Sequence, residues 1–482
     1  MTLIAILAAP VTGALLIGLT GKSPNLREAV TLLSGTITFA LVASLYPMVM
    51  AGQVPKMVLG EMLPGLDLVL ALEPLGMLFA LVASFLWIVT SIYSIGYMRG
   101  HHEINQTRFY LFFAIAIAAT LGVALAGNML TLFVFYEILT FSTFPLVTHA
   151  GTPEAKKAGR VYLGILVGTS IGLQLIAVIW TWNLAGTLDF RAGGILQGNV
   201  SKTVATILLL LYVFGIGKAA LMPFHRWLPA AMVAPTPVSA LLHAVAVVKA
   251  GVFTVLKVSY YIFGLDFLAT LPSAEWLQYI AAATILIASL VAMTQDNLKA
   301  RLAYSTISQL SYIVLGAMLA GPLGFIGGSI HIAMHAFGKI TLFFCAGAIL
   351  VATHKKKVSE MGGLGRAMPL TMFAFFVGSM SIIGLPPLGG MWSKWYLALG
   401  ALEADKIFLV GVLMVSSVFN VAYLLPIPFR AFFGKAPEGE KSAGIKEAPV
   451  PILIAISITM IGSIVLFFFP GPVYDLIKQL VM

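Results

Sequence analysis

The sequence contains a single cysteine and very few charged residues. One cysteine, Cys345, cannot form an intrachain disulfide, a CxxC zinc site or a cysteine-bound iron–sulfur cluster, and its apolar neighbours indicate a small core residue. Asp, Glu, Lys and Arg make up 10% of the 482 residues, whereas soluble domains carry about 25%. Because 60% of the residues are hydrophobic, the composition indicates an integral membrane protein.

The chain also lacks the motifs of nucleotide-binding proteins and covalent catalysts. It has no Walker loop, no Gly-rich fingerprint that follows a strand, and no cluster of metal ligands. We therefore expect no cofactor and no metal ion, and whether the chain is part of an enzyme complex stays open. The net charge of +10 does not indicate a nucleic-acid partner, because the basic residues follow membrane topology.

Long hydrophobic runs fill most of the chain. Because a membrane-spanning helix needs about 20 apolar residues, these runs predict an all-α polytopic membrane protein with about fourteen transmembrane helices. The predicted helices cover residues 2–20, 28–52, 70–98, 108–126, 128–149, 158–185, 203–221, 236–263, 275–295, 301–320, 322–353, 368–386, 405–428 and 450–470.

The basic residues in the loops predict the orientation of these helices. Eighteen lysine and arginine residues fall in the odd-numbered loops, against five in the even-numbered loops and the carboxyl tail. Since basic loops stay in the cytoplasm, both termini are expected outside a cell (cytoplasmic) membrane. The amino terminus lacks the basic start of a signal peptide, so we expect it to be a spanning helix.

Six charged residues lie inside the predicted helices, where each costs about 2.5–3.5 kcal/mol unless it is paired or hydrated. Glu137 is the only charged residue between Phe109 and Pro153 and lies roughly 14 Å along its helix. Lys257 lies near the outer end of its helix, and we expect it to extend to the membrane surface. The other four are Lys218, Lys249, Lys339 and Lys394.

Proline residues interrupt two of the predicted helices beside a lysine. The seventh helix breaks at Met222-Pro223 after Lys218, and the twelfth breaks at Pro386-Pro387 before Lys394. Breaks at membrane depth are tolerated only inside protein or along a hydrated cavity.

This spacing is typical of transporters built from inverted repeats. We expect two inverted five-helix repeats, helices 4–8 and 9–13, although the halves share no evident sequence identity. The predicted organisation is a three-helix segment at 1–107, repeats at 108–263 and 275–430, and a carboxyl-terminal loop and last helix at 431–482.

Histidines accompany the buried lysines. His331, His335 and Lys339 are spaced by four residues and share one helix face, and His243 precedes Lys249 by six residues. A histidine pair can be an ordinary core pair, but the neighbouring lysine favours a proton relay, since histidine charges and discharges near neutrality.

Glu137 and Lys218 admit two compatible interpretations, a structural ion pair and a switch of proton affinity. The predicted proton path runs through Glu137, Lys218, His243, Lys249, His331, His335, Lys339 and Lys394.

Three segments resemble the antiporter-like subunits of the complex I superfamily, which occur in respiratory complex I, membrane-bound hydrogenases and Mrp-type multisubunit sodium/proton antiporters. They are PFHRWLPAAMVAPTPVSALLHAVAVVKAG, HAFGKITLFFCAGAI and GLPPLGGMWSKW. The resemblance implies a fourteen-helix fold with two inverted five-helix repeats. It implies a function within a large membrane complex, with other antiporter-like and small membrane subunits as partners.

The resemblance also implies a role for each matching residue. Glu137 and Lys218 correspond to the central glutamate–lysine pair, His243 and Lys249 to connecting groups, Lys339 to the eleventh-helix lysine and Lys394 to the residue at the far half-channel. The likeness is greatest to the D-type subunit of Mrp antiporters and its hydrogenase counterpart. The chain ends twelve residues after Pro470, which argues against the larger A-type member with its lateral helix.

Three functions follow from these observations. The first is a proton-translocating subunit of a multisubunit sodium/proton antiporter, and the second is the same module in a redox-driven pump. The third, an inactive scaffold, is disfavoured by the complete row of buried charges. A sodium site needs several oxygen ligands, so we expect protons on this chain and leave open whether sodium crosses a partner.

Lys394 should be the last proton carrier on the path. We expect Lys394→Ala to abolish proton transport, while Lys394→Glu keeps part of it because a buried carboxyl can also carry a proton. Proton transport measured in both variants tests this, and full activity of Lys394→Ala would place the exit elsewhere.

Overall fold

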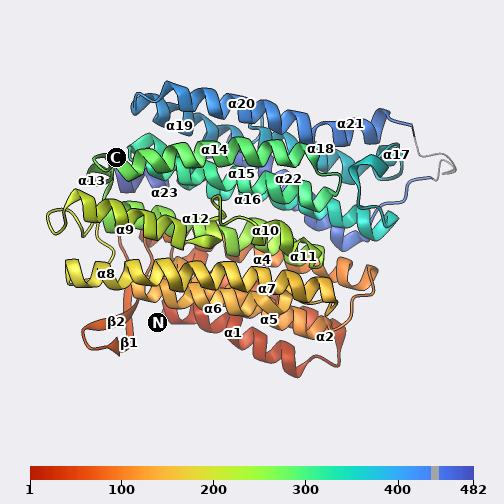
Figure 1. Ribbon diagram of the computed structural model, residues 1–482. Helices are drawn as coiled ribbons and strands as arrows, with labels where there is room; N and C mark the ends of the chain where they lie inside the picture. The colour runs from red at the N-terminus through yellow and green to blue at the C-terminus, as the bar shows by residue number, and fades with distance from the viewer. Residues whose placement is uncertain (436–443) are drawn as a thin grey trace.

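Long helices fill almost the whole computed structural model, which describes residues 1–435 and 444–482. They run side by side as one bundle, and both chain ends lie at the same end of it, beside a β-hairpin (Figure 1). An all-α membrane fold is thus confirmed. Lys441, one of the basic residues that predict the orientation, lies outside the described residues.

The first part of the chain contains the hairpin, which the hydrophobic runs did not predict. Pro64 and Gly65, with a φ of +77°, form the turn between its strands. The elements are α1 (Thr2–Leu19), α2 (Pro24–Ser44), α3 (Tyr46–Met50), β1 (Lys56–Leu63), β2 (Leu66–Ala71) and α4 (Pro74–Gly100).

The expected start of the third helix at residue 70 is wrong, because residues 70 and 71 belong to β2. Glu73 sets the true start by accepting hydrogen bonds from the backbone N–H groups of Leu75 and Gly76, and Pro74 occupies the first helical position.

The second part begins with a capped helix and ends with a fully buried one. The Asn128 side chain accepts a hydrogen bond from the Thr131 N–H at 2.8 Å and so begins α6. The elements are α5 (Gln106–Ala124), α6 (Met129–Val147), α7 (Pro153–Thr169), η1 (Ser170–Gln174), α8 (Leu175–Ala185), α9 (Lys202–Gly215), η2 (Gly217–Ala219), α10 (Trp227–Ala230), η3 (Ala231–Val233), α11 (Thr236–Ala240), η4 (Leu241–Val245), α12 (Val247–Lys257), η5 (Val258–Phe263) and α13 (Leu265–Ala269).

The third part is built around α16, which contacts α4, α15, α18, α19 and α22. Its elements are α14 (Pro272–Thr294), α15 (Leu298–Met318), α16 (Pro322–Thr353), η6 (Val358–Glu360), α17 (Leu364–Ala367), α18 (Pro369–Ile383), α19 (Gly390–Glu403), α20 (Ile407–Leu424), α21 (Pro426–Phe433), α22 (Val450–Phe468) and α23 (Gly471–Val481).

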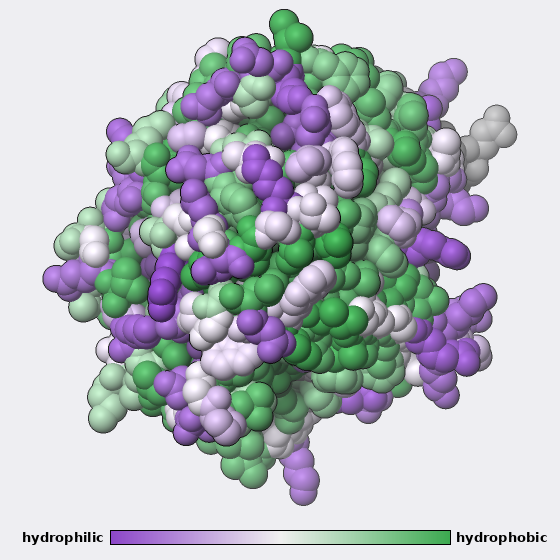
Figure 2. All heavy atoms as spheres, turned by 60° about the vertical axis from the view of Figure 1, so that its left-hand side comes forward, coloured by the Kyte–Doolittle hydropathy of each residue, from purple (hydrophilic) through white to green (hydrophobic). Residues whose placement is uncertain are grey.

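Each of the fourteen predicted ranges contains helix in the structure. Within the described residues, eleven helices are long and apolar enough to cross a membrane, and two further apolar helices are shorter. Hydrophobic side chains form a broad surface band between hydrophilic residues over the end that carries the termini and at the opposite edge (Figure 2). The number of fourteen spans, the inverted repeats and the four segment boundaries stay predictions.

Both predicted helix interruptions are present. The first follows α9, where Ala220 has a φ of +53°, and the second follows α18, where Gly384 has a φ of +90°. Each contains one cis X–Pro bond, at Met222-Pro223 and at Pro386-Pro387. The interruptions leave Lys218 and Lys394 beside helix ends, where carbonyl groups lack helical partners.

Gly251 allows α12 to pack directly on the first interruption. A Cβ atom at this position would lie 2.3 Å from the Ala219 nitrogen and 2.3 Å from the Lys218 carbonyl carbon. We expect Gly251→Ala to lower the free energy of unfolding by about 1–3 kcal/mol, because backbone atoms must move apart.

Thermal unfolding of the purified protein in detergent measures this effect. Gly168→Ala in α7 is the matched control, since a Cβ there meets no atom within 4 Å. Equal unfolding temperatures of the two variants would show that the close packing has no energetic weight.

Candidate functional site

Lys218 occupies the first interruption and is completely buried. Its Nζ donates hydrogen bonds to the Tyr136 carbonyl at 2.8 Å and to Thr140 Oγ1 at 2.6 Å, and lies 3.2 Å from the centre of the Tyr136 ring. The Trp227 indole donates to the Gly217 carbonyl at 3.0 Å and so holds the short segment that carries the lysine. All partners of the ammonium group are therefore neutral.

Glu137 lies next to Tyr136 on α6 but does not form an ion pair with Lys218. Its charge acts on the lysine, yet neither carboxylate oxygen lies within the 4.0 Å of an ion pair. Both oxygens are inaccessible to solvent and have no hydrogen-bond partner among the described residues. The structure thus places the predicted pair close together in an open arrangement, with the carboxylate free to accept a proton or a donor.

Lys249 and His335 form the contact between α12 and α16. Lys249 Nζ lies 2.7 Å from His335 Nδ1, and both side chains are buried. On α16, the rings of His331 and His335 have centres 5.5 Å apart. His331 Nδ1 lies 2.7 Å from Ser393 Oγ on α19. The predicted histidine face therefore connects Lys249 to the residue beside Lys394.

The second interruption binds Lys394 through its free carbonyl. Lys394 Nζ donates to the Ile383 carbonyl at 2.9 Å and to Ser417 Oγ at 3.2 Å. Lys339, which shares a helix face with the histidines, contacts neither of them and donates to Ser305 Oγ at 2.7 Å. Lys339 and the histidine pair thus belong to two separate hydrogen-bond networks.

His243 lies on η4, a π-helical segment that interrupts the eighth predicted helix. Neither ring nitrogen has a partner among the described residues, and the ring lies on Phe343 with centres 4.6 Å apart. π-helical segments are frequent at functional sites. The structure therefore places His243 beside the path without a direct contact to Lys249.

The expectation that Lys257 reaches the membrane surface is wrong. Its side chain is fully buried, and its Nζ lies 2.9 Å from Glu73 Oε1 and 3.2 Å from the Ala126 carbonyl. The Tyr261 hydroxyl donates to Glu73 Oε2 at 2.9 Å. Lys257 fails to extend outward because the helix-capping carboxylate of Glu73 lies within the bundle.

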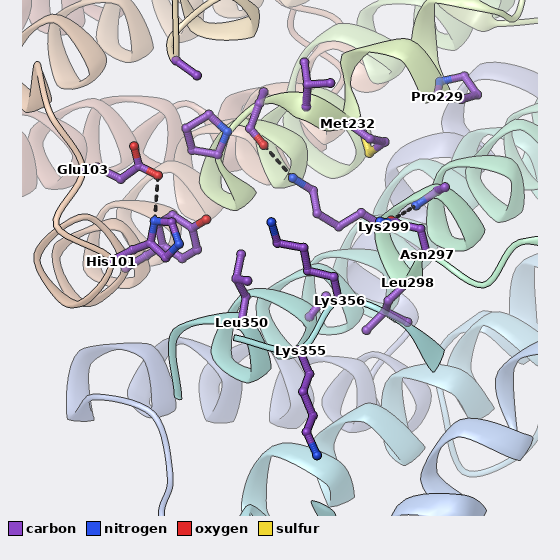
Figure 3. A pocket seen from close by; sticks show the side chains of 17 residues that line it. His101, Glu103, Pro229, Met232, Asn297, Leu298, Lys299, Leu350, Lys355 and Lys356 are labelled. Atoms are coloured by element: carbon purple, nitrogen blue, oxygen red, sulfur yellow. Dashed lines mark hydrogen bonds and ion pairs between the residues drawn. The ribbon is translucent and has the colours of Figure 1, made fainter. Parts of the chain in front are cut away.

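A cytoplasmic-side pocket, under the predicted orientation, approaches the path from one end of the bundle. Lys299 and Lys356 point into it and Lys355 points away (Figure 3). Its volume is about 590 Å³, and Lys299 Nζ donates to the Ala234 carbonyl at 2.6 Å. Ala346 lines it one helical turn from Phe343, the residue that covers His243.

The opposite wall of this pocket carries an acidic residue and histidines. His101 Nδ1 lies 3.0 Å from Glu103 Oε1 (Figure 3), and His149 Nε2 lies 4.0 Å from the other oxygen of Glu103. Burial lowers the pKa of His149. Within the described residues, no group of three or more His, Cys, Asp or Glu side chains is arranged to hold a metal ion.

Sequence reasoning missed the neutral partners of the lysines. Thr140, Ser305, Ser393 and Ser417 each accept or share a hydrogen bond with a lysine or histidine of the path. Serine and threonine are common in membrane helices, so their composition gives no signal. Only their spacing relative to the facing helices, which the sequence does not contain, would identify them.

Comparison with known proteins gives consistent similarities. Residues 126–420 match the family described as "NADH:quinone oxidoreductase/Mrp antiporter, TM". NADH-quinone oxidoreductase subunit N of Desulforudis audaxviator is 34% identical over 84% of this chain and 82% of that protein. One Na(+)/H(+) antiporter subunit of Alkalihalophilus pseudofirmus is 30% identical over 84% of this chain, which spans about half (52%) of that longer protein.

The same fold occurs in a solved membrane complex. A chain of the Mrp complex from Dietzia sp. DQ12-45-1b superimposes with a TM-score of 0.88, covering 99% of this chain and 96% of that one at 22% identity. The likeness extends over the whole bundle and concerns the fold.

The Glu73–Lys257 pair should be a structural element with a large energetic weight. We expect Glu73→Gln to lower the free energy of unfolding by about 3–5 kcal/mol, because it leaves a buried ammonium group without its carboxylate. Replacing both residues, as Glu73→Gln with Lys257→Met, should restore most of the loss.

Thermal unfolding checks this expectation. Glu275→Gln, which breaks the exposed Glu275–Lys406 pair, is the control and should change little. An unchanged unfolding temperature of Glu73→Gln would contradict a structural role for the buried pair.

Proposed function

The chain belongs to the NADH:quinone oxidoreductase/Mrp antiporter transmembrane family, and from this premise we propose that it is the proton-translocating subunit of a multisubunit sodium/proton antiporter. Its proton path comprises Glu137, Lys218, His243, Lys249, His331, His335, Lys339 and Lys394.

The contact between Lys249 and His335 is the observation that carries this proposal. An ammonium group and a ring nitrogen 2.7 Å apart can share one proton, so the pair titrates as a unit. Lys249 lies between the two interruptions in sequence, and His335 leads through His331 to Ser393 beside Lys394. A proton that arrives at the centre therefore has a donor and an acceptor in contact at the next step.

The partners of the lysines favour protons over sodium as the ion on this chain. A sodium ion needs several oxygen ligands without a competing positive charge. The nearest oxygens along the row, such as Thr140 Oγ1, Ser305 Oγ and Ser417 Oγ, each bind an ammonium group instead. In this proposal sodium crosses another chain of the complex.

The orientation and the assembly are part of the same proposal. Both chain ends lie at one end of the bundle (Figure 1), and the basic loops favour placing that end outside the cell membrane. The chain would work as a D-type subunit, together with other antiporter-like subunits and small membrane subunits.

The similarity to NADH-quinone oxidoreductase subunit N favours a second candidate. In this alternative the same path pumps protons in a redox-driven complex, such as a hydrogenase or a quinone oxidoreductase, with the redox centres on other chains. The driving reaction separates the two: a sodium gradient drives proton flux in the first, and electron transfer in the second.

Glu137 should control proton entry into the path. We expect Glu137→Gln to reduce proton flux by about 100-fold or more, the usual contribution of a positioned proton-transfer group. Glu137→Asp should retain part of the flux, because it keeps the charge and shortens its reach.

Proton flux in inverted membrane vesicles, driven by a sodium gradient or by electron donors, measures this, with complex assembly checked on native gels. Glu154→Gln on the exposed first turn of α7 is the control. A wild-type flux in an assembled Glu137→Gln complex would overturn the proposed function.

A further inference from the structure

Lys339 is joined to a network on α20 that the histidine path does not use. Ser305 Oγ on α15 accepts hydrogen bonds from Lys339 Nζ at 2.7 Å and from the Tyr423 hydroxyl at 2.9 Å. The Tyr423 hydroxyl also contacts Asn420 Oδ1 on its own helix. Lys339 is thus the start of a series of neutral polar groups.

This series continues along one face of α20 toward Lys394. Ser416, Asn420 and Tyr423 are spaced by four and three residues, so their side chains lie one above another. Ser417, next to Ser416, accepts a hydrogen bond from Lys394 Nζ at 3.2 Å. The same helix face therefore approaches Lys339 at one end and Lys394 at the other.

Several atoms of this face are buried without any partner among the described residues. They are Asn420 Nδ2, Ser416 Oγ, the Tyr312 hydroxyl and both amide atoms of Gln309. Tyr312 lies beside Lys394, whose Nζ is 5.0 Å from its ring centre. An unsatisfied buried polar group costs about 1–3 kcal/mol, so a cluster of four such side chains indicates a place that binds ordered water.

We propose that this polar row, comprising Ser305, Tyr423, Asn420, Ser416 and Ser417, is a second proton path from Lys339 to Lys394, parallel to the path through His331. The inference rests on the proposed function and adds a branch to it. Its members are new functional residues on α15 and α20.

The chemistry of the row suits proton transfer and excludes a metal cation. One proton leaves Lys339 Nζ and one is taken up at Lys394 Nζ, while each hydroxyl and each bound water accepts one proton and releases another. No member of the row changes its charge. The oxygens are neutral and an ammonium group stands at each end, so a sodium ion would meet repulsion from both sides.

Two parallel paths predict that losses combine in a characteristic way. We expect Tyr423→Phe alone and His331→Leu alone each to reduce proton flux by less than about tenfold, because the other branch still conducts. The double variant should lose about 100-fold or more, since it lacks a proton-transfer group in both branches.

Tyr212→Phe is the matched control for Tyr423→Phe. Tyr212 is also buried, and its hydroxyl shares a 2.9 Å hydrogen bond with Thr181 Oγ1, which lies outside the proton path. Adding Tyr212→Phe to His331→Leu should leave the flux at the level of His331→Leu alone. If Tyr423→Phe prevents assembly, Ser416→Ala replaces it in the same series.

The outcomes separate this inference from the proposed function. A double variant with the flux of His331→Leu alone would overturn the second path while leaving proton translocation intact. Failure of the proposed function would instead appear as Glu137-independent flux in the otherwise unchanged protein.

Discussion

The cost of burying lysines without counter-charges governs this structure. Lys218, Lys249 and Lys339 are fully buried, and their hydrogen-bond partners within the described residues are carbonyl, hydroxyl or imidazole groups. A lysine in hydrocarbon costs about 2.5–3.5 kcal/mol, and neutral partners offset only part of this cost. Such lysines bind and release protons readily when a neighbouring charge changes, because their charged form is held only by dipoles.

The helix interruptions supply these dipoles. Lys394 takes up the carbonyl at the end of α18, and Lys218 lies in the short segment between α9 and α10. An unbroken helix would use these carbonyl groups internally. Lys257 provides the contrast within the same protein, since it pairs with Glu73 and its carboxylate is also held by backbone N–H groups. One lysine is thus fixed in an ion pair, and four remain available for proton exchange.

Much of the fold was predictable from the sequence, because it depends on local patterns. Hydrophobic runs predicted the helical ranges, the prolines predicted both interruptions, and the quoted motifs predicted the family, which the comparisons confirm. The four-residue spacing of His331, His335 and Lys339 predicted a shared face.

The partners of the buried charges were not predictable, because they depend on contacts between distant segments. Glu73 and Lys257 meet across 184 positions, and a short hairpin precedes Glu73 where a longer helix was expected. Ser416, Asn420 and Tyr423 look like ordinary residues of an apolar helix until α15 is packed against them.

Lys249 is the residue on which the account depends most, because it joins the Glu137–Lys218 half to the His335 half. Proton flux through the reconstituted complex containing Lys249→Met tests this most directly. The account predicts a loss of about 100-fold with normal assembly. A flux equal to that of the unmodified complex would contradict it.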